Sequence, residues 1–285
     1  MVRALTDTVD MGNAPDLTGQ TRLFFHIADP VAQVKAPMLF NTVLAKRGID
    51  ARLVPLHVAA DALKDTFKVL AAAQNVGGLL VTMPHKQTIV LLAHDLGEQA
   101  RLVGAANSVR FDNDQSIADM FDGLGLVRGA AERGIGITGR SVLLLGAGGA
   151  ARAVAFALAS AGAERLTVAN RTARTAEALV DEVRTVFPAL IVEVGGNQIV
   201  DQHDVVINAT SLGMRRGDPS PIPVSGLQAS TSVIDIVTVP GTALLTGAAA
   251  RGCRTMDGSD MLRAMADAVI DFWVTGISPP STLLG

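Results

Sequence analysis

Short apolar segments alternate with longer amphipathic segments along the first part of the chain. Apolar residues run continuously in the shorter segments and recur every three or four positions in the longer ones, which predicts buried strands and helices respectively. In order, the pattern predicts strand, helix, strand, helix and strand over residues 21–27, 36–47, 51–58, 61–72 and 78–82. This alternation is typical of βαβ units around a parallel sheet.

A second series of the same kind begins after Gly139. Strands are predicted at residues 141–145, 165–169, 191–194, 205–208 and 233–237, and helices at 150–161 and 175–185. We therefore predict an α/β protein of two doubly wound domains. The last helical pattern, at 261–273, is predicted to return to the first domain. Residues 1–125 with 258–285 then form one discontinuous domain, and residues 126–257 form the other.

The composition agrees with two compact domains. At 285 residues the chain exceeds the roughly 250 to 300 residues at which single cores split. Hydrophobic residues make up 49% and charged residues 18%, which leaves little room for disorder. The net charge of -3 and the scarcity of aromatic residues exclude a typical nucleic-acid-binding surface.

The sequence also gives expectations about location and metals. The longest apolar stretches, such as residues 141–145, are far shorter than the roughly 20 residues of a membrane span. The single Cys253 and a start without a leader pattern over residues 1–20 favour a cytoplasmic protein. The five histidines are scattered without metal-ligand spacing, so no metal site is expected.

A glycine-rich segment opens the second domain. It follows the predicted strand that ends at Leu145 and contains the predicted cofactor residues Gly146, Ala147, Gly148, Gly149 and Ala150, followed by Ala151. Glycines in such a turn let the backbone approach a pyrophosphate, and the helix N-terminus that follows attracts the anion. An ordinary αβ turn is the alternative. Since strand, turn and helix occur in the required order, we predict a Rossmann dinucleotide-binding domain.

The end of the next strand bears on the choice of dinucleotide. NAD-specific sites usually place an acid there, but this chain has Asn170, Arg171, Thr172 and Arg174. A guanidinium pairs well with a 2′-phosphate, so the segment favours NADP, with NAD as the alternative cofactor. A solvated basic turn is the competing reading.

Several segments together resemble the shikimate dehydrogenase family. They occur in family order over residues 22–276 and comprise residues 81–86 (VTMPHK), 104–109 (GAANSV), 121–125 (FDGLG), 146–151, 170–172, 208–214 (NATSLGM) and 258–273. The resemblance implies an N-terminal substrate domain, a Rossmann NADP domain and an active site in the cleft between them.

The resemblance also implies roles for individual residues. Lys86 matches the catalytic lysine and Asp122 its paired aspartate, and such a pair can accept and return the proton of an oxidised hydroxyl. Thr82 and Asn107 match ligands of substrate hydroxyls. Asn208, Thr210, Met214 and Gly258 fall at the nicotinamide end of the cofactor site. Turn capping is the alternative role for Asn107 and Asn208.

Several family ligands are missing. A Ser-x-Ser-Pro segment that holds the substrate carboxylate aligns with residues 34–37, where Val34 and Ala36 replace both serines. Three further family ligands, an asparagine, a tyrosine and a glutamine, are replaced here by Leu80, Val237 and Met265 respectively. Each unmade polar contact costs about 1 to 3 kcal/mol. Lys35, if it points inward, is the candidate replacement ligand. We therefore predict a changed substrate: a quinate-like, amino-substituted or less polar cyclic alcohol.

Three other readings remain open. The first is an ordinary biosynthetic shikimate dehydrogenase that reduces 3-dehydroshikimate. The second is a non-catalytic regulator that binds a dinucleotide or metabolite, although retention of Lys86 and Asp122 argues against it. The third, a folate-type dehydrogenase, fits the motifs less closely. The expected partner is a small cyclic hydroxy acid or alcohol, and the expected state is a monomer or homodimer.

Overall fold

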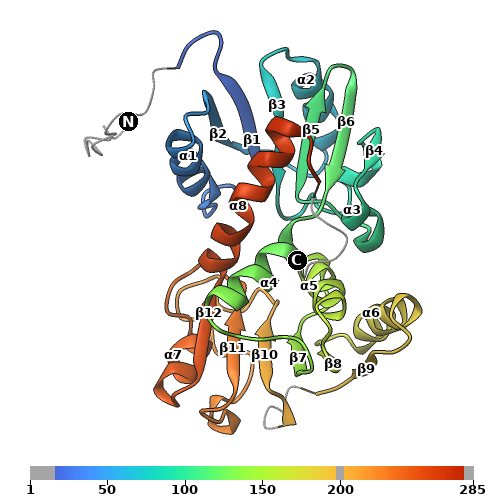
Figure 1. Ribbon diagram of the computed structural model, residues 1–285, viewed down its shortest axis with the longest axis vertical. Coiled ribbons are helices and arrows are strands. Elements are labelled where there is room, and N and C mark those ends of the chain that lie inside the picture. The colour runs from blue at the N-terminus through green and yellow to red at the C-terminus, as the bar shows by residue number, and fades with distance from the viewer. Residues whose placement is uncertain (1–16, 197–201, 279–285) are drawn as a thin grey trace.

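The structure, a computed structural model, describes residues 17–196 and 202–278 and contains two six-stranded sheets (Figure 1). The first sheet has the order β2-β1-β3-β5-β6-β4. Its strands are β1 (Arg22–Ala28), β2 (Ala51–His57), β3 (Val76–Val81), β4 (Asp95–Leu96), β5 (Ser108–Asp112) and β6 (Gln115–Asp119). The helices of this part are α1 (Ala36–Lys46), α2 (Leu63–Ala72) and α3 (Glu98–Val103), with a short 3-10 helix η1 at Ile89–Leu91.

The first sheet is mixed, which corrects the prediction of a parallel sheet. β1 pairs in parallel with β2 and β3, as predicted. β5, however, is antiparallel to both β3 and β6. The β5–β6 connection is a two-residue turn that contains Asn113 at a φ of +53°. Only antiparallel neighbours can be joined by so short a connection.

The second sheet is fully parallel, with the order β12-β11-β10-β7-β8-β9. Its strands are β7 (Ser141–Leu145), β8 (Arg165–Ala169), β9 (Ile191–Val194), β10 (Val205–Asn208), β11 (Ser232–Asp235) and β12 (Arg254–Asp257). Its helices are α5 (Gly149–Ser160), α6 (Ala173–Val186) and α7 (Ala243–Ala250), with a 3-10 helix η3 at Val224–Gly226. This is the strand order of a Rossmann domain, and the bounds predicted for β7, β8, β9 and β10 are confirmed.

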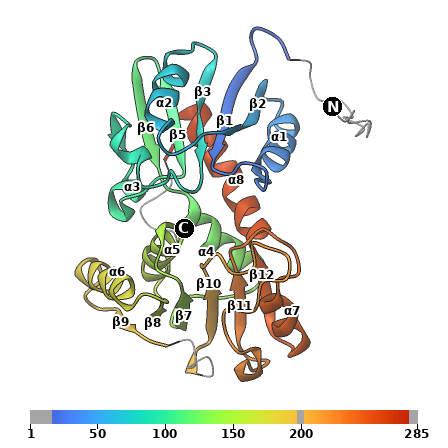
Figure 2. The same cartoon turned by 180° about the vertical axis from the view of Figure 1, so that it is seen from behind.

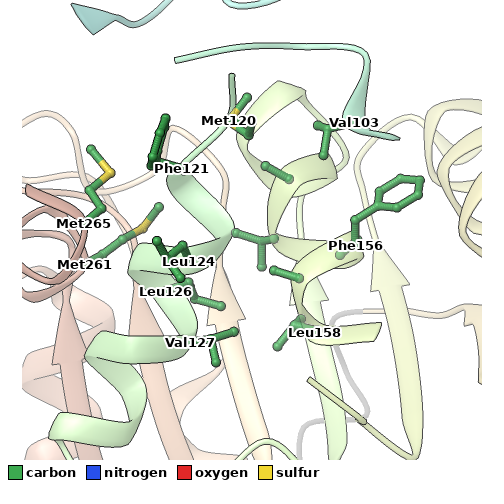
Figure 3. Packing of buried hydrophobic residues seen from close by; sticks show 14 of the residues in the cluster. Val103, Met120, Phe121, Leu124, Leu126, Val127, Phe156, Leu158, Met261 and Met265 are labelled. Carbon is green, nitrogen blue, oxygen red and sulfur yellow. The ribbon is translucent and has the colours of Figure 1, made fainter. Parts of the chain in front are cut away.

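Two helices connect the sheets: α4 (Asp122–Glu132) and α8 (Gly258–Thr275) (Figures 1 and 2). They pack closely because α4 carries glycines at the contact: a Cβ on Gly125 would stand 2.6 Å from the carbonyl oxygen of Met261. Figure 3 shows α4 between Met261 and Met265 on one side and Phe156 and Leu158 on the other. α4 therefore lies at the centre of the molecule.

The far end of α8 packs against the first sheet, where the indole of Trp273 stacks on Phe24 with ring centroids 4.3 Å apart. The contact places the end of the last helix beside the first sheet, and its assignment to the first domain stays a prediction. The predicted boundary between residues 125 and 126 falls within α4. The division of the chain into a discontinuous domain and an inserted one stays a prediction.

Among the described residues, no helix is both long and apolar enough to cross a membrane. The prediction that residues 1–20 contain no leader concerns mostly residues 1–16, which lie outside the described residues.

Candidate active site

Lys86, Asn107 and Asp122 meet where the first sheet faces α4. The Nζ of Lys86 lies 2.6 Å from Oδ2 of Asp122, and the two side chains are 15% and 6% exposed. The amide Nδ2 of Asn107 donates to the other carboxylate oxygen, Oδ1, at 2.7 Å. Both oxygens of Asp122 therefore have a donor, and the side chain of Lys86 stays partly exposed.

The local fold explains why these three side chains meet. Lys86 follows the end of β3, and its carbonyl oxygen accepts a hydrogen bond from the backbone of Ala106, beside Asn107. The preceding His85 is buried and bonds to the carbonyl oxygen of Val58 at 2.8 Å, which anchors the turn. Asp122 is the first residue of α4, where the helix dipole favours a negative charge.

This geometry suits proton transfer at an alcohol or a ketone. A lysine next to a carboxylate can take the proton of a hydroxyl group or return it to a carbonyl oxygen. Asn107 also accepts from the backbone N–H of Phe121 at 2.9 Å and contacts the sulfur of Met265 at 3.7 Å. It therefore fixes Asp122 and is largely enclosed, so its predicted contact with substrate stays a prediction. Thr82 is half-buried at the end of β3, in the same strand-to-turn segment as Lys86.

The glycine-rich turn joins β7 to α5, next to β10, where the strand order of the second sheet reverses. In such sheets dinucleotides bind in the crevice beyond the carboxyl ends of these strands. Gly146 has a φ of +106°, and a Cβ there would stand 2.8 Å from the carbonyl oxygen of Ala209. Gly148 and Gly149 have open space where a Cβ would stand, while Ala147 and Ala150 are half-buried. The turn and the N-terminus of α5 therefore fit a pyrophosphate.

Asn208 ends β10 and is fully buried. Its Nδ2 donates to the carbonyl oxygen of Leu212 at 3.0 Å and to Asp235 at 2.9 Å, while its Oδ1 accepts from the hydroxyl of Thr210 at 2.7 Å. The side chain is thus occupied in holding the loop over 209–214, as the turn-capping reading had it. Met214, in that loop, is 46% exposed. Contact of Thr210 and Met214 with a cofactor stays a prediction.

The other predicted cofactor residues lie apart from the Lys86 cluster. Arg171, Thr172 and Arg174 are exposed in the turn after β8, and Asn170 donates to the carbonyl oxygen of Thr172 at 3.0 Å. This turn neighbours the glycine-rich turn because β7 and β8 are paired. Gly258 is buried, and its backbone N–H donates to the carbonyl oxygen of Val237 at 3.1 Å.

Lys35 does not join the Lys86 cluster. It is exposed before α1, and its Nζ donates to the carbonyl oxygen of Thr238 at 2.7 Å, so it joins the segment before α1 to the segment after β11. Leu80, Val237 and Met265 are at most 5% exposed, so each of these positions has a buried apolar side chain.

His26, which no sequence motif singles out, lies near enough to Lys86 to feel its charge. His26 is on β1, is 6% exposed, and its Nδ1 is enclosed without a hydrogen-bond partner. Burial, with a further contribution from the charge of Lys86, lowers its pKa from 6.5 to about 3. The imidazole is therefore neutral at neutral pH. A lone polar residue in an apolar strand is the only signal that the sequence offered.

The lowered pKa of His26 predicts acid sensitivity. Between pH 6.5 and about pH 3 the unfolded chain binds a proton at this residue that the folded protein does not. The free energy of unfolding therefore decreases as the pH is lowered, by about 1.4 kcal/mol per pH unit within this range. Between pH 7 and pH 5 the total loss is about 2 kcal/mol. Urea unfolding of the protein and of the His26→Leu variant, each at pH 7 and at pH 5, measures this loss of stability. An equal loss of stability in the variant would contradict the assignment.

Comparison with known proteins gives family matches in both halves of the chain. Residues 27–109 match the family described as shikimate dehydrogenase substrate binding domain, and residues 129–215 match shikimate / quinate 5-dehydrogenase. A shikimate dehydrogenase (NADP(+)) of Geobacter metallireducens is 35% identical over 94% of this chain and 96% of its own.

Solved structures have the same fold over nearly the whole chain. Shikimate dehydrogenase of Aquifex aeolicus matches with a TM-score of 0.84 and 29% identity, covering 94% of this chain and 97% of that one. The 5-ketofructose reductase of a Gluconobacter strain matches with a TM-score of 0.82 and 30% identity, covering 93% and 97%.

The fold, the paired Lys86 and Asp122, and these relatives define a dehydrogenase that acts on a CH–OH group. More specifically, the chain belongs to the shikimate dehydrogenase family.

Proposed function

We propose that this protein is an NADP-dependent dehydrogenase that interconverts a secondary alcohol and a ketone on a cyclic, polyhydroxylated substrate. The observation that carries the proposal is the 2.6 Å contact between Lys86 and Asp122, at the end of a sheet that faces the Rossmann domain. The relative from Geobacter metallireducens is named for NADP(+), which supports the choice of cofactor.

Lys86 and Asp122 together transfer the proton of the substrate hydroxyl group. When the alcohol is oxidised, Nζ of Lys86 passes one of its protons to the carboxylate of Asp122 as it takes the hydroxyl proton. In the reverse direction, Asp122 returns a proton to Nζ as Nζ protonates the carbonyl oxygen. Asn107 holds Asp122 in place through its 2.7 Å hydrogen bond. Bound NADP would supply the hydride acceptor, held by the turn at Gly146, Gly148 and Gly149 and by Arg171.

The substrate is proposed to differ from shikimate. Leu80 and Met265 are buried apolar side chains at positions where hydrogen-bonding ligands were expected, and Met265 contacts Asn107. The similarity to a 5-ketofructose reductase supports a wider range of polyhydroxylated ketones. Assays with shikimate, quinate and 5-ketofructose, each with both cofactors, test the proposal. Shikimate as the preferred substrate, with the efficiency of the biosynthetic enzymes, would contradict the altered pocket and favour the biosynthetic reading.

Arg171 is predicted to set the preference for NADP. Replacing Arg171 with alanine removes a charged partner of the 2′-phosphate, and hydrogen bonds to charged groups contribute about 1.5 to 3 kcal/mol. We expect KM for NADP to rise about 10- to 100-fold while KM for NAD changes little. Steady-state kinetics with both cofactors measure this, and Arg128→Ala, an exposed arginine on α4, is the control. Equal increases in KM for NADP and for NAD would rule out the role of Arg171 in the preference for NADP.

A further inference from the structure

Arg152 lies in the first turn of α5, directly after the glycine-rich turn. Its backbone N–H donates to the carbonyl oxygen of Gly148 at 2.8 Å, so the turn fixes its position. Its side chain is 26% exposed and lines a cavity of about 160 Å³ together with Ala147, Gly148 and Gln87. Gln87 is the residue after Lys86. The same cavity therefore borders the predicted pyrophosphate site, Arg152 and the segment that carries the reacting lysine.

The guanidinium of Arg152 reaches the first part of the chain, where α3 lies beside α5 (Figures 1 and 2). Its Nε donates to the carbonyl oxygen of Val103, the last residue of α3. The next residue, Gly104, has a φ of +67°, and a Cβ there would stand 3.7 Å from Nη2 of Arg152. Arg152 is thus bonded to the point where α3 ends and the chain turns toward Asn107.

The segment that begins at this point supports both reacting residues. The backbone N–H of Ala106 donates to the carbonyl oxygen of Lys86 at 2.9 Å. The side chain of Asn107, the next residue, donates to Oδ1 of Asp122 at 2.7 Å. Because Val103 is only a few residues away along the chain, a displacement of the end of α3 would shift the support of Lys86 and Asp122 together.

Two further contacts fix the direction of the guanidinium. Its Nη1 pairs with Glu182 of α6, and its Cζ lies 5.6 Å from the centre of the Phe156 ring on α5. Both partners belong to the helices of the second sheet, so they hold the side chain of Arg152 on that side while it bonds to Val103. A hydrogen bond from a charged donor is about twice as strong as a neutral one. The bond to Val103 is therefore suited to hold α3 against α5.

We infer that Arg152 is a positioning residue that sets the Lys86–Asp122 pair relative to the dinucleotide turn by bonding the end of α3 to α5. The inference rests on the proposed dehydrogenase function and deepens it by naming what aligns the cofactor with the acid–base pair. Reacting atoms must lie about 3 to 3.5 Å apart, and a misplacement of about 1 Å can lower the rate about 100-fold. Arg152 itself transfers no proton.

The first test replaces Arg152 with methionine, which keeps an apolar stem and removes the donors. The assay uses the best substrate among shikimate, quinate and 5-ketofructose, and kcat is expressed per NADPH-binding site so that unfolded protein is not counted. We expect kcat to fall about 10- to 100-fold while the Kd for NADPH changes little. Arg152→Lys, whose ammonium can still donate to the carbonyl oxygen of Val103, should recover most of the loss.

The matched control is Arg184→Met. Arg184 of α6 makes the same kinds of bond, to the carboxylate of Asp181 at 3.0 Å and to the carbonyl oxygen of Val192 at 2.8 Å. Both of its partners, however, belong to the second sheet and its helices. The loss of Arg184 should therefore leave kcat unchanged.

A second measurement uses the unaltered protein and needs no turnover. Hydrogen exchange followed by mass spectrometry compares the protein with and without NADPH. We expect NADPH to slow exchange at residues 146–151 and also at residues 98–107, because the bond from Arg152 passes the ordering of the turn to α3. In Arg152→Met the slowing at residues 146–151 should remain and the slowing at residues 98–107 should disappear.

Four results would each overturn the inference: unchanged kcat in Arg152→Met, an Arg152→Lys protein that is equally slow, an equal loss in Arg184→Met, or slowing by NADPH that is confined to residues 146–151. If turnover is observed and depends on Lys86 while these results fail, the dehydrogenase function stands and only the role of Arg152 is lost. If no alcohol or ketone is turned over but NADPH slows exchange at residues 98–107 through Arg152, the link between α3 and α5 stands and the proposed function fails.

Discussion

Replacing Lys86 with alanine lowers kcat by a factor of about 10² to 10⁴, the usual contribution of a positioned acid or base. The reason is geometric: the Nζ of Lys86 is held 2.6 Å from Asp122 and is the cation of the pair. Cofactor binding should survive, because the dinucleotide turn lies on the other sheet. Steady-state kinetics and a fluorescence titration with NADPH measure the two effects separately.

The control for Lys86 is Lys68→Ala, which removes an exposed lysine on α2. It should leave kcat and the affinity for NADPH unchanged. Because Lys86→Ala leaves Asp122 without its counter-ion, its thermal unfolding must be compared as well. A folded Lys86→Ala protein with normal turnover would contradict the assignment of this lysine.

Replacing Gly258 with alanine destabilises the protein by about 3 kcal/mol, at the upper end of the usual cost of overpacking. A Cβ at this position would stand 2.2 Å from the carbonyl oxygen of Ile236 and 2.8 Å from the carbonyl carbon of Val237. Backbone atoms cannot move aside as a flexible side chain can. Since Gly258 begins α8, the strain would spread to the helix that connects both sheets. Urea unfolding measures the loss.

The matched control is Gly136→Ala, because a Cβ on Gly136 would meet no atom within 4 Å. Its unfolding free energy should stay the same or rise slightly, since alanine restricts the unfolded chain. Equal stability of Gly258→Ala and Gly136→Ala would show that the backbone at Ile236 can shift to make room for a Cβ at position 258. The requirement for glycine would then lie in cofactor binding.

The features of the second sheet were predictable from local sequence. Strands buried on both faces read as apolar runs, and the glycine-rich turn follows the first of them, so residues 141–145 and the turn at Gly146 were placed correctly. β12 was missed because Arg254–Asp257 is short and has only one buried residue. Lys86 and Asp122 were identified through family resemblance, since a lysine and an aspartate 36 residues apart show no local pattern.

Other features depend on contacts between distant segments. The antiparallel β5–β6 hairpin breaks the helix–strand alternation on which the parallel prediction was based. The bond from Lys35 to Thr238 joins residues 203 positions apart, and no local signal could show whether Lys35 points inward. The unpaired Nδ1 of His26 likewise follows only from the neighbours that the fold places around it.

The central claim is that this protein transfers hydride and does not merely bind a dinucleotide. The most direct measurement is the formation of NADPH from NADP by the purified protein with a panel of cyclic polyols, both acids and their uncharged esters, repeated with Lys86→Ala. We predict NADPH formation with at least one uncharged polyol and its loss in the variant, with NADP binding retained in both. NADP binding without NADPH formation from any polyol, by either protein, would contradict the claim and favour a dinucleotide-binding regulator.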